Sequence, residues 1–576
     1  MKKRKLRSQD WFAIKGRQGF EHRSNMRGLG LPDSTFDGRP IIGICNVWSE
    51  FNPCDAGQRD LIGHVKSGVL EAGGIPLEFP APAIGEPIMR PSPLMFRNLT
   101  SMVVEELIRA NPIDGVVLLA GCDKTTPALL MGALSCDIPL IVVSSGPKIN
   151  ATFRGETLGS GTHIWQSEQD ASAGTMSHAD VAASEAAHSR SHGTCMTMGT
   201  ASTMASIVEA MGLSLEYNSC IPAPDVRRAL LARHSGRAIV QGVNDDRRPS
   251  TFLTRQSFEN AIRTVAAIGG SSNAVIHLQA IAGRAKIPLT LDDWNTLGRD
   301  IPCLVDLMPA GRFLMDDFYG AGGLSVVIKR LVDQNLFDAQ EMTVLGEPLA
   351  ARLPSAKCFN NEVIRTFDNP VSPQGGLAVL KGNLAPDGAI IKPAAASTRL
   401  LKHKGKAIVF DDIKDYMEAA SSETFDVSAD DIMIIRNCGL KGYPGMPEVA
   451  NACVPQKLLK EGVNDIIRIS DARMSGTAFG SVILHVSPEA AVGGPLALVK
   501  NGDMIDVNVE QGSLNLLVSA EELKEREQAL SMSRRDDDEA SGYKSLFMNH
   551  VLQPDRGADF DFLLGQRGAD TPREST

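Results

Sequence analysis

Residues 116–127 read VVLLAGCDKTTP, and this stretch decides the interpretation of the fold. Its apolar residues predict a buried strand that ends at Gly121, and Pro127 suits the first turn of a following helix. Cys122, Asp123 and Lys124 then lie between the carboxyl end of a strand and the start of a helix, where open α/β sheets bind ligands. A helix N-terminus favours a thiolate, but an ordinary turn with a buried cysteine explains the stretch equally well.

Apolar runs alternate with helical patterns on both sides of this stretch. Runs at 41–47, 75–79 and 140–143 predict three more strands, separated by helices at 56–71, 99–110 and from 129 to 134. Continuous apolar strands with intervening helices are typical of a parallel sheet that is covered on both faces. Further helices are predicted at 199–211, 258–268 and 274–285.

The pattern changes after a turn-rich junction near residue 370. Short strands separated by turn residues are predicted at 377–380, 389–392, 407–410, 432–435, 466–469, 482–486, 504–509 and 514–518. Many short strands with few helices indicate a barrel or sandwich. We therefore predict an α/β domain over residues 1–375 and a smaller β-barrel-like domain over residues 376–576. The charged tail after residue 531 is expected to be loosely ordered in part.

Composition and charge exclude several classes of protein. The 576 residues are 43% hydrophobic and carry a formal net charge of −10. Such an acidic chain repels phosphate backbones, so nucleic acid is not expected as a partner. No segment reaches the ~18 apolar residues that a membrane span needs. The basic start lacks the apolar core of a secretory signal, so we expect a cytoplasmic protein.

Three of the ten cysteines occupy equivalent positions in the chain. Cys54, Cys122 and Cys195 each stand in a loop before a predicted helix, and no CxxC pattern is present. Three thiolates that converge at one end of a sheet would hold an iron–sulfur cluster and leave one iron open to substrate. Long spacings give little support by themselves, so three structural cysteines remain the alternative.

Two further loops in the second region carry reactive groups. Residues 466–477 read IIRISDARMSGT, which is an apolar strand followed by a loop of small residues that includes Ser475. The G-x-S-x-G pattern of a hydrolase elbow is absent, which disfavours a serine hydrolase. Residues 441–448 read KGYPGMPE and place the carboxylate of Glu448 after two proline-containing turns.

Two of these stretches resemble the signatures of a known family. GCDKTTPA at 121–128 resembles the first signature of the dihydroxy-acid dehydratase / 6-phosphogluconate dehydratase family, and SDARMSG at 470–476 resembles the second. GGSSNA at 269–274 is similar to a further family stretch. Details of the second signature, and of residues 195–204, resemble the sugar-acid dehydratases of the L-arabinonate and D-xylonate type more than the branched-chain biosynthetic enzymes.

The resemblance implies two inorganic cofactors. The sugar-acid type is known for a [2Fe–2S] cluster held by three cysteines, with [4Fe–4S] as the alternative found in 6-phosphogluconate dehydratase. Carried onto this sequence, the cluster ligands are Cys54, Cys122 and Cys195. The implied Mg²⁺ ligands are Glu86, Asp123, Glu448 and a carbamylated Lys124; an unmodified Lys124 that neutralises nearby carboxylates is the alternative.

The resemblance also implies a reaction. A hydro-lyase would dehydrate an aldonate such as L-arabinonate or D-xylonate to its 2-keto-3-deoxy acid, with Ser475 as the base and Thr477 donating a hydrogen bond to its alkoxide. The alternatives are a branched-chain dihydroxy-acid dehydratase and a non-catalytic thiol protein or iron sensor. The expected partners are a small sugar acid and further copies of the chain, in a homodimer or homotetramer.

Overall fold

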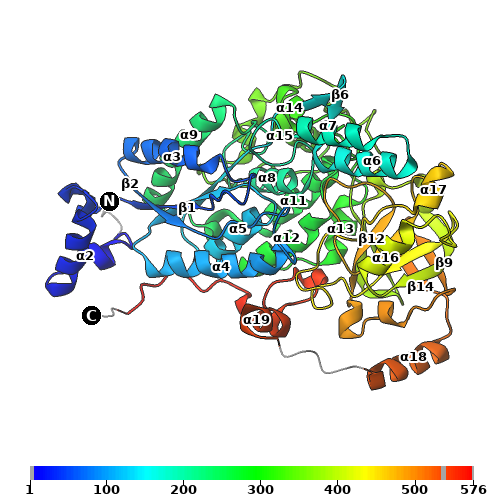
Figure 1. Cartoon of the computed structure of the whole chain (residues 1–576). Coiled ribbons are helices and arrows are strands. Elements are labelled where there is room, and N and C mark those ends of the chain that lie inside the picture. The colour runs from blue at the N-terminus through cyan, green and yellow to red at the C-terminus, as the bar shows by residue number, and fades with distance from the viewer. Residues whose placement is uncertain (1–4, 534–539, 574–576) are drawn as a thin grey trace.

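A computed structural model describes residues 5–533 and 540–573 (Figure 1). Its N-terminal part contains a four-stranded sheet in the order β2-β1-β3-β4. The strands are β1 (Ile41–Asn46), β2 (Ile75–Pro80), β3 (Gly115–Ala120) and β4 (Leu140–Ser144). All three pairings are parallel, which confirms the prediction from the four apolar runs.

Helices cover both faces of this sheet, as the alternating pattern predicts (Figure 1). On one face α3 (Gln58–Glu71) packs against α9 (Val226–Asn244), and on the other α4 (Pro93–Ala110) packs against α5 (Thr125–Cys136). Every residue of β3 is buried, because both faces of the strand are covered. The helix predicted from residue 129 begins earlier, at Thr125, and Pro127 lies in its first turn.

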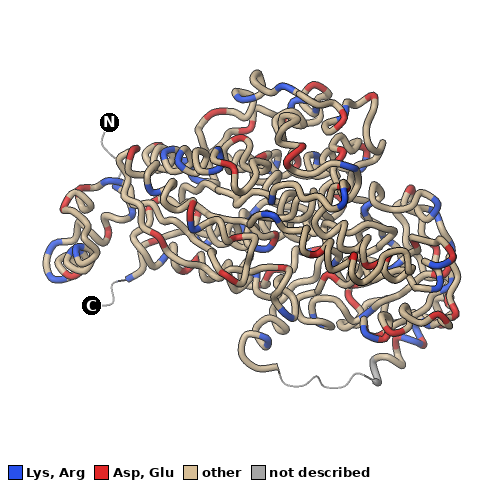
Figure 2. Tube along the Cα trace, turned by 45° about the horizontal axis from the view of Figure 1, so that its top comes forward, with Lys and Arg blue, Asp and Glu red and all other residues tan. Residues whose placement is uncertain are grey.

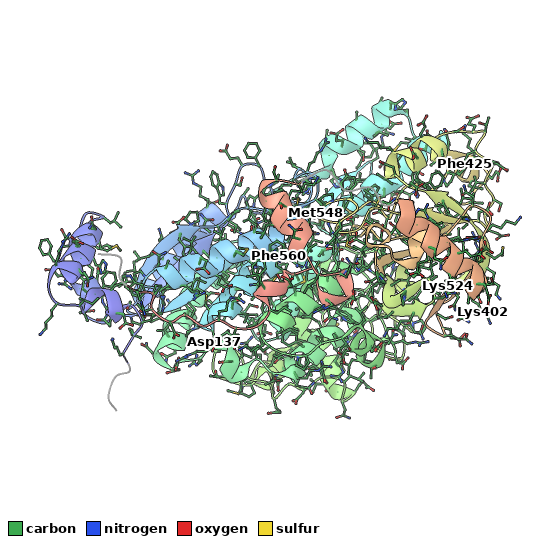
Figure 3. The ribbon with its side chains drawn as sticks, turned by 90° about the horizontal axis from the view of Figure 1, so that it is seen from below. Asp137, Lys402, Phe425, Lys524, Met548 and Phe560 are labelled. Carbon is green, nitrogen blue, oxygen red and sulfur yellow. The ribbon has the colours of Figure 1, made fainter. Side chains whose placement is uncertain are left out.

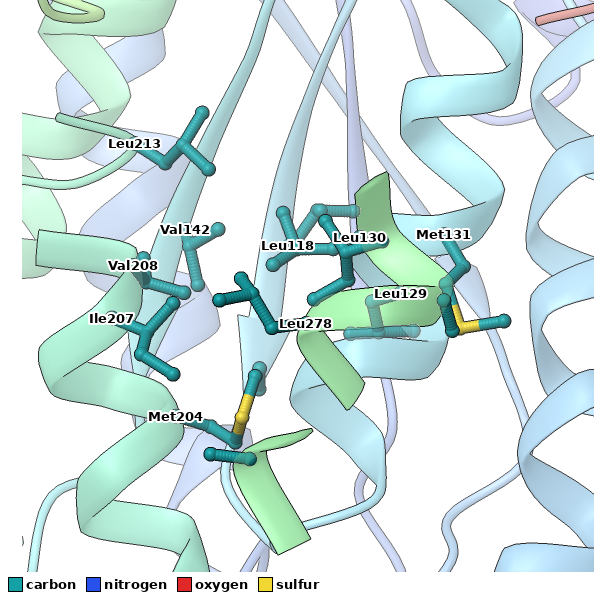
Figure 4. Close-up of a cluster of buried hydrophobic side chains, with 14 of the residues drawn as sticks. Leu118, Leu129, Leu130, Met131, Val142, Met204, Ile207, Val208, Leu213 and Leu278 are labelled. Atoms are coloured by element: carbon teal, nitrogen blue, oxygen red, sulfur yellow. The ribbon is translucent and has the colours of Figure 1, made fainter. Parts of the chain in front are cut away.

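The other predicted helices are also present. They are α8 (Thr200–Ala210), α11 (Arg255–Ala267) and α12 (Asn273–Arg284). Figure 4 shows Met204 and Ile207 of α8 in one apolar cluster with Val142 of β4 and Leu278 of α12. This packing joins the helical layer to the sheet. Further helices of this part are α1 (Gln9–Phe12), α2 (Arg17–Arg27), α10 (Pro249–Phe252), α13 (Leu291–Gly298), α14 (Met315–Gly320) and α15 (Gly323–Asp333).

One excursion between β4 and α8 was not predicted from the sequence. It consists of β5 (Ala151–Phe153), β6 (Glu156–Leu158), α6 (Ser160–Ala173) and α7 (His178–His188). Very few side chains of α6 and α7 are buried, so these helices lack the apolar stripe that predicts a helix packed on a core.

The eight short strands predicted after residue 376 close into a barrel in the order β10-β11-β12-β8-β7-β14-β13-β9. Their bounds are β7 (Ala378–Gly382), β8 (Ala385–Ile391), β9 (Lys402–Phe410), β10 (Ile432–Ile435), β11 (Ile467–Ser470), β12 (Val482–Ser487), β13 (Met504–Asn508) and β14 (Ser513–Leu516). Helices α16 (Ile413–Ala420), α17 (Gln456–Lys460) and α18 (Ala520–Ser533) accompany them. The β-barrel-like region is therefore confirmed, while the division of the chain at residue 375 stays a prediction.

The chain after the barrel returns to the helices of the first part. Residues 534–539, in the tail that was expected to be loosely ordered in part, lie outside the described residues, while α19 (Gly542–His550) and the segment after it pack on the body. Phe560, labelled in Figure 3, is fully buried. Arg97 of α4 donates to Ala558 O at 2.8 Å, and Arg284 of α12 donates to Asp559 Oδ1 at 3.0 Å. Buried ion pairs and apolar contacts thus hold this segment on the body, although its charged sequence does not predict such packing.

The close packing of α3 on α9 gives a matched pair of tests. A Cβ at Gly68 would collide with the backbone carbonyl of Arg233, whereas a Cβ at Gly63 would meet open space. We predict that Gly68→Ala lowers the stability by about 1–3 kcal/mol through overpacking. Gly63→Ala should instead stabilise the helix by roughly 0.5–1 kcal/mol. Thermal unfolding of both variants checks this, and equal midpoints would refute the packing account.

Candidate active site

The three loop cysteines of the sequence analysis come together at the carboxyl edge of the parallel sheet. Cys54 and Cys122 are buried and Cys195 is half-buried. The thiols of Cys54 and Cys122 hydrogen-bond, and this contact together with burial raises the pKa of Cys122. Burial and the nearby Cys54 raise the pKa of Cys195 to about 12. The structure therefore gathers three thiols, and each of them makes it harder for its neighbours to become negatively charged thiolates.

Asp55 joins two of these cysteine loops, although its sequence context had not marked it as a functional residue. Its Oδ1 accepts hydrogen bonds from Cys122 N at 3.2 Å and from Gln58 Nε2 at 2.8 Å. A Cβ at Gly121 would collide with the same carboxylate, so a glycine is required there. Burial raises the pKa of Asp55 to about 8. Asp55 thus fixes the distance between the Cys54 loop and the Cys122 loop.

Three carboxylates meet beside the thiols. Glu86, Asp123 and Glu448 each offer an oxygen, and these oxygens lie within 4.8 Å of one another. The three residues come from the loop after β2, the loop after β3 and the loop between β10 and α17. Two separate parts of the chain therefore build one acidic group, and the structure brings together all three carboxylates that the resemblance implied.

Two buried cations hold this acidic group together. Lys124 Nζ lies 2.8 Å from Glu86 Oε2, 2.7 Å from Asp123 Oδ2 and 3.3 Å from Glu448 Oε1. Arg473 Nη1 lies 2.9 Å from Glu448 Oε1, and Nη2 lies 3.2 Å from Glu86 Oε1. Both cations are fully buried. Arg473 was quoted within the second signature but was assigned no role.

The pKa shifts follow from this arrangement. Burial alone would raise the pKa of Glu86, but Lys124 and Arg473 outweigh it and hold the pKa below its usual value. Burial and repulsion from Glu86 raise the pKa of Glu448. Burial and Arg473 oppose the charge of Lys124, yet the surrounding carboxylates raise its pKa. Three carboxylates against two cations leave an excess of negative charge, which suits a further cation.

The catalytic loop predicted from the second signature leaves the barrel after β11 and reaches this group. Ser475 Oγ and Thr477 Oγ1 lie 2.9 Å apart, and Thr477 N donates to Ser475 Oγ at 3.3 Å. Thr162 of α6 donates to Thr477 O at 2.6 Å. A Cβ at Gly476 would collide with Thr200 at the start of α8, so the loop lies directly against the first part of the chain.

Asn273 connects this loop to the carboxylates. Its Nδ2 donates to Glu448 Oε1 at 2.7 Å and to Met474 O at 3.2 Å. Asn273 is the first residue of α12, within the GGSSNA stretch that is similar to a family stretch but was given no role from the sequence. Its position directly after the two serines, at the start of a predicted helix, was the available signal, although its partner Glu448 is 175 residues away.

Two further observations concern the distribution of charge along the chain and the possibility of a membrane-spanning helix. Figure 2 shows basic and acidic positions interspersed along the described trace. Within residues 5–533 and 540–573, no helix combines the length and the apolar character that crossing a membrane requires.

Sequence comparison identifies the class of protein that this fold and site define. The chain belongs to the family described as Dihydroxy-acid/6-phosphogluconate dehydratase, whose N-terminal part matches residues 39–352 and whose C-terminal part matches residues 362–558. The chain is therefore a dehydratase, which is a hydro-lyase.

Individual relatives narrow this class. An L-arabinonate dehydratase of Rhizobium leguminosarum bv. trifolii is 53% identical, over 99% of this chain and 98% of the relative. A D-xylonate dehydratase of Caulobacter vibrioides is 38% identical, over 97% and 96%. A dihydroxy-acid dehydratase of Methanoregula boonei is 39% identical, over 89% and 93%. The chain is of the sugar-acid dehydratase type.

Proposed function

We propose that this protein dehydrates an aldonate, such as L-arabinonate or D-xylonate, to the 2-keto-3-deoxy acid. The 53% identity to an L-arabinonate dehydratase, against 39% to a dihydroxy-acid dehydratase, supports a sugar acid over a branched-chain substrate. The observation that carries the proposal is the meeting of three carboxylates, three thiols and the Ser475 loop at one edge of the sheet. The branched-chain dihydroxy-acid dehydratase reaction is the alternative.

The acidic group fits Mg²⁺, which takes oxygen ligands. Glu86, Asp123 and Glu448 would supply three of them, and their excess negative charge would favour the ion. Lys124 contacts all three as an ammonium group, where it would compete with a metal ion. Carbamylation of Lys124 would replace this cation by an oxygen ligand at the same place, and we include it in the proposal.

The thiols fit an iron–sulfur cluster. Cys54, Cys122 and Cys195 would bind it as thiolates, and three ligands would leave one iron position open. The hydrogen bond with Cys54 and burial raise the pKa of Cys122, and burial and the nearby Cys54 raise the pKa of Cys195. A bound metal reverses this effect, because a coordinating thiol is deprotonated outright. We propose [2Fe–2S], with [4Fe–4S] as the alternative.

The residues of the chain would have separate roles in the reaction. When bound, the hard cation would polarise the substrate carboxylate and C2 hydroxyl and lower the pKa of nearby oxygens, and the cluster would supply Lewis acidity at the C3 oxygen. Ser475 Oγ takes the proton from C2. Thr477 N donates to that oxygen, and the Thr477 hydroxyl, 2.9 Å away, would donate to it once Ser475 is deprotonated, so both would stabilise its negative charge. Arg473 and Asn273 keep Glu448 in place.

The proposed partners follow from the family resemblance and from the acidic composition of the chain. A small sugar acid is the substrate, and the protein is a homodimer or homotetramer that binds neither nucleic acid nor membrane.

The proposed function is tested by a keto-acid assay on anaerobically purified protein with a panel of aldonates and a branched-chain dihydroxy acid. We expect brown protein with about two irons per chain, and turnover of at least one pentonate in preference to the branched-chain acid. Cys122→Ser should lose iron and activity together. Cys303→Ser, a buried cysteine outside the site, should keep both. Colourless protein that is fully active would contradict the cluster, and turnover of the branched-chain acid alone would favour the alternative.

The role of Ser475 is tested by removing its hydroxyl. Ser475→Ala should fold, keep its iron and still bind substrate, because other groups supply most of the binding. Its turnover should fall by at least ~10²-fold, which is the low end for a positioned acid–base group. Exchange of the C2 proton with deuterated solvent should fall in parallel.

Thr477→Ala is the matched control, since it removes only a donor to Ser475 Oγ and should lose less activity. If Ser475 merely filled a tight turn, alanine would be nearly silent, and near-wild-type turnover of Ser475→Ala would assign the base to another residue.

A further inference from the structure

The loop that carries Glu448 is held at its start by a buried carboxylate that has no part in the proposed mechanism. Glu489 follows β12, is fully buried and contacts the loop between β10 and α17. We propose that Glu489, itself held by Gln553 of the C-terminal segment, is a positioning residue that keeps Glu448 in place for the divalent cation. The inference rests on the metal site of the proposed function and adds a residue that acts on this site through the loop.

Hydrogen bonds join Glu489 to the backbone of this loop. Lys441 N donates to Glu489 Oε2 at 2.9 Å, and Gly442 N donates to the same oxygen at 3.2 Å. A Cβ at Gly439 would collide with this carboxylate, so the loop backbone passes directly against it. One side chain therefore fixes the start of the segment that ends at Glu448.

The far end of the same segment is held by residues beside the acidic group. Ser92 Oγ donates to Gly445 O at 2.6 Å, and Arg473 Nε donates to Met446 O at 2.7 Å. Because both ends of the segment are held, a displacement at its start would be passed along a short, restrained piece of backbone to Glu448.

Asp471 provides a second connection between Glu489 and the site. Its Oδ2 accepts a hydrogen bond from Ala490 N at 3.0 Å, and its Oδ1 accepts one from Cys438 N at 2.9 Å. Asp471 stands two residues before Arg473, which pairs with two carboxylates of the site. The position of Glu489 is therefore linked to the site along two routes, one through the loop and one through the arginine.

Gln553 holds Glu489 from the side of the C-terminal segment. Its Nε2 donates to Glu489 Oε1 at 2.8 Å, and its Oε1 accepts a hydrogen bond from Glu489 N at 3.0 Å. Burial raises the pKa of Glu489, and hydrogen bonds from Gln553 and from the loop backbone oppose this rise. The amide thus stabilises the buried carboxylate, and through it the C-terminal segment supports the loop.

Replacing the carboxylate by an amide tests this arrangement with little change of size. In Glu489→Gln the new NH₂ group would face either the two backbone N–H groups of the loop or the NH₂ group of Gln553, so donors would meet donors. We expect Glu489→Gln to bind Mn²⁺ roughly 10-fold more weakly than wild type, a loss typical of removing a group that supports a metal ligand. Equilibrium dialysis of metal-free protein against Mn²⁺ in bicarbonate buffer measures this without turnover.

A second variant tests whether Gln553 acts through Glu489. Gln553→Ala should weaken Mn²⁺ binding by about 3-fold, since it removes the amide that holds the carboxylate. The double variant should bind no more weakly than Glu489→Gln alone, because the two side chains act as one unit. Gln553 is only half-buried, so if Glu489→Gln does not fold, wild-type Mn²⁺ binding by Gln553→Ala refutes the proposal.

The matched control is Glu209→Gln, a change at another buried carboxylate. Glu209 of α8 accepts hydrogen bonds from Tyr217 N and Ser219 N, each at 2.9 Å. Its replacement should lower the thermal midpoint, because the same kind of hydrogen bonds is lost, but should leave Mn²⁺ binding unchanged. Iron content should stay at the wild-type level in Glu489→Gln and in Glu209→Gln.

The outcomes separate this inference from the proposed function. Wild-type Mn²⁺ affinity in Glu489→Gln, or an equal loss of affinity in Glu209→Gln, would refute the positioning role alone. If wild-type protein binds no Mn²⁺, the metal site fails and the positioning role fails with it. If Mn²⁺ binding weakens as expected but no aldonate is dehydrated, the positioning role stands and the proposed reaction fails.

Discussion

The buried ion group formed by Lys124, Arg473 and three carboxylates is the interaction on which the rest of the structure depends. Taking five charges out of water is costly, and each is tolerated only because at least one group of opposite charge lies about 3 Å away. Asp123 and Lys124 come from the loop that follows β3 of the sheet, while Glu448 and Arg473 come from loops of the barrel region. The group therefore requires both regions at once, and losing one member would leave an uncompensated buried charge.

Three features of the architecture hold the two regions together at the site. Parallel strands place the ends of β1 and β3 at one edge, which brings Cys54 and Cys122 together. The Ser475 loop from the barrel closes against α8, where only glycine fits at position 476. The C-terminal segment then fastens α4 and α12 through Arg97 and Arg284. Helix α12, which begins at the site with Asn273, is thus held at its far end by Arg284, whereas Arg97 holds α4 near its start.

Much of the scaffold could be predicted from the sequence, because local patterns determine it. The four sheet strands are continuous apolar runs, and the eight barrel strands are separated by turn residues. The excursion through α6 and α7 was missed since few of its side chains are buried. The packing of the C-terminal segment on the body could not be predicted, because it comes from contacts such as Arg284–Asp559, 275 residues apart.

The residues of the site also fall into two groups, those that could be predicted from the sequence and those that only the structure identifies. The signature residues Cys122, Asp123 and Ser475 could be singled out from their position after strands. Glu86 was reached only through the family resemblance, because nothing in its own stretch of sequence marks it. Arg473 and Asn273 were quoted without a role, since their partners lie far away in the chain and only the folded structure brings them within hydrogen-bonding distance.

The central claim is that Glu86, Asp123 and Glu448 form a site for one divalent cation. The most direct measurement is the binding of Mn²⁺, a paramagnetic substitute for Mg²⁺, to metal-free protein in bicarbonate buffer. Electron paramagnetic resonance detects the bound and the free ion. The account predicts one tight site per wild-type chain and an affinity at least ~10-fold weaker in Asp123→Asn. Asp292→Asn, at an exposed acidic residue, should bind like wild type. Equal binding by Asp123→Asn and wild type would contradict the account.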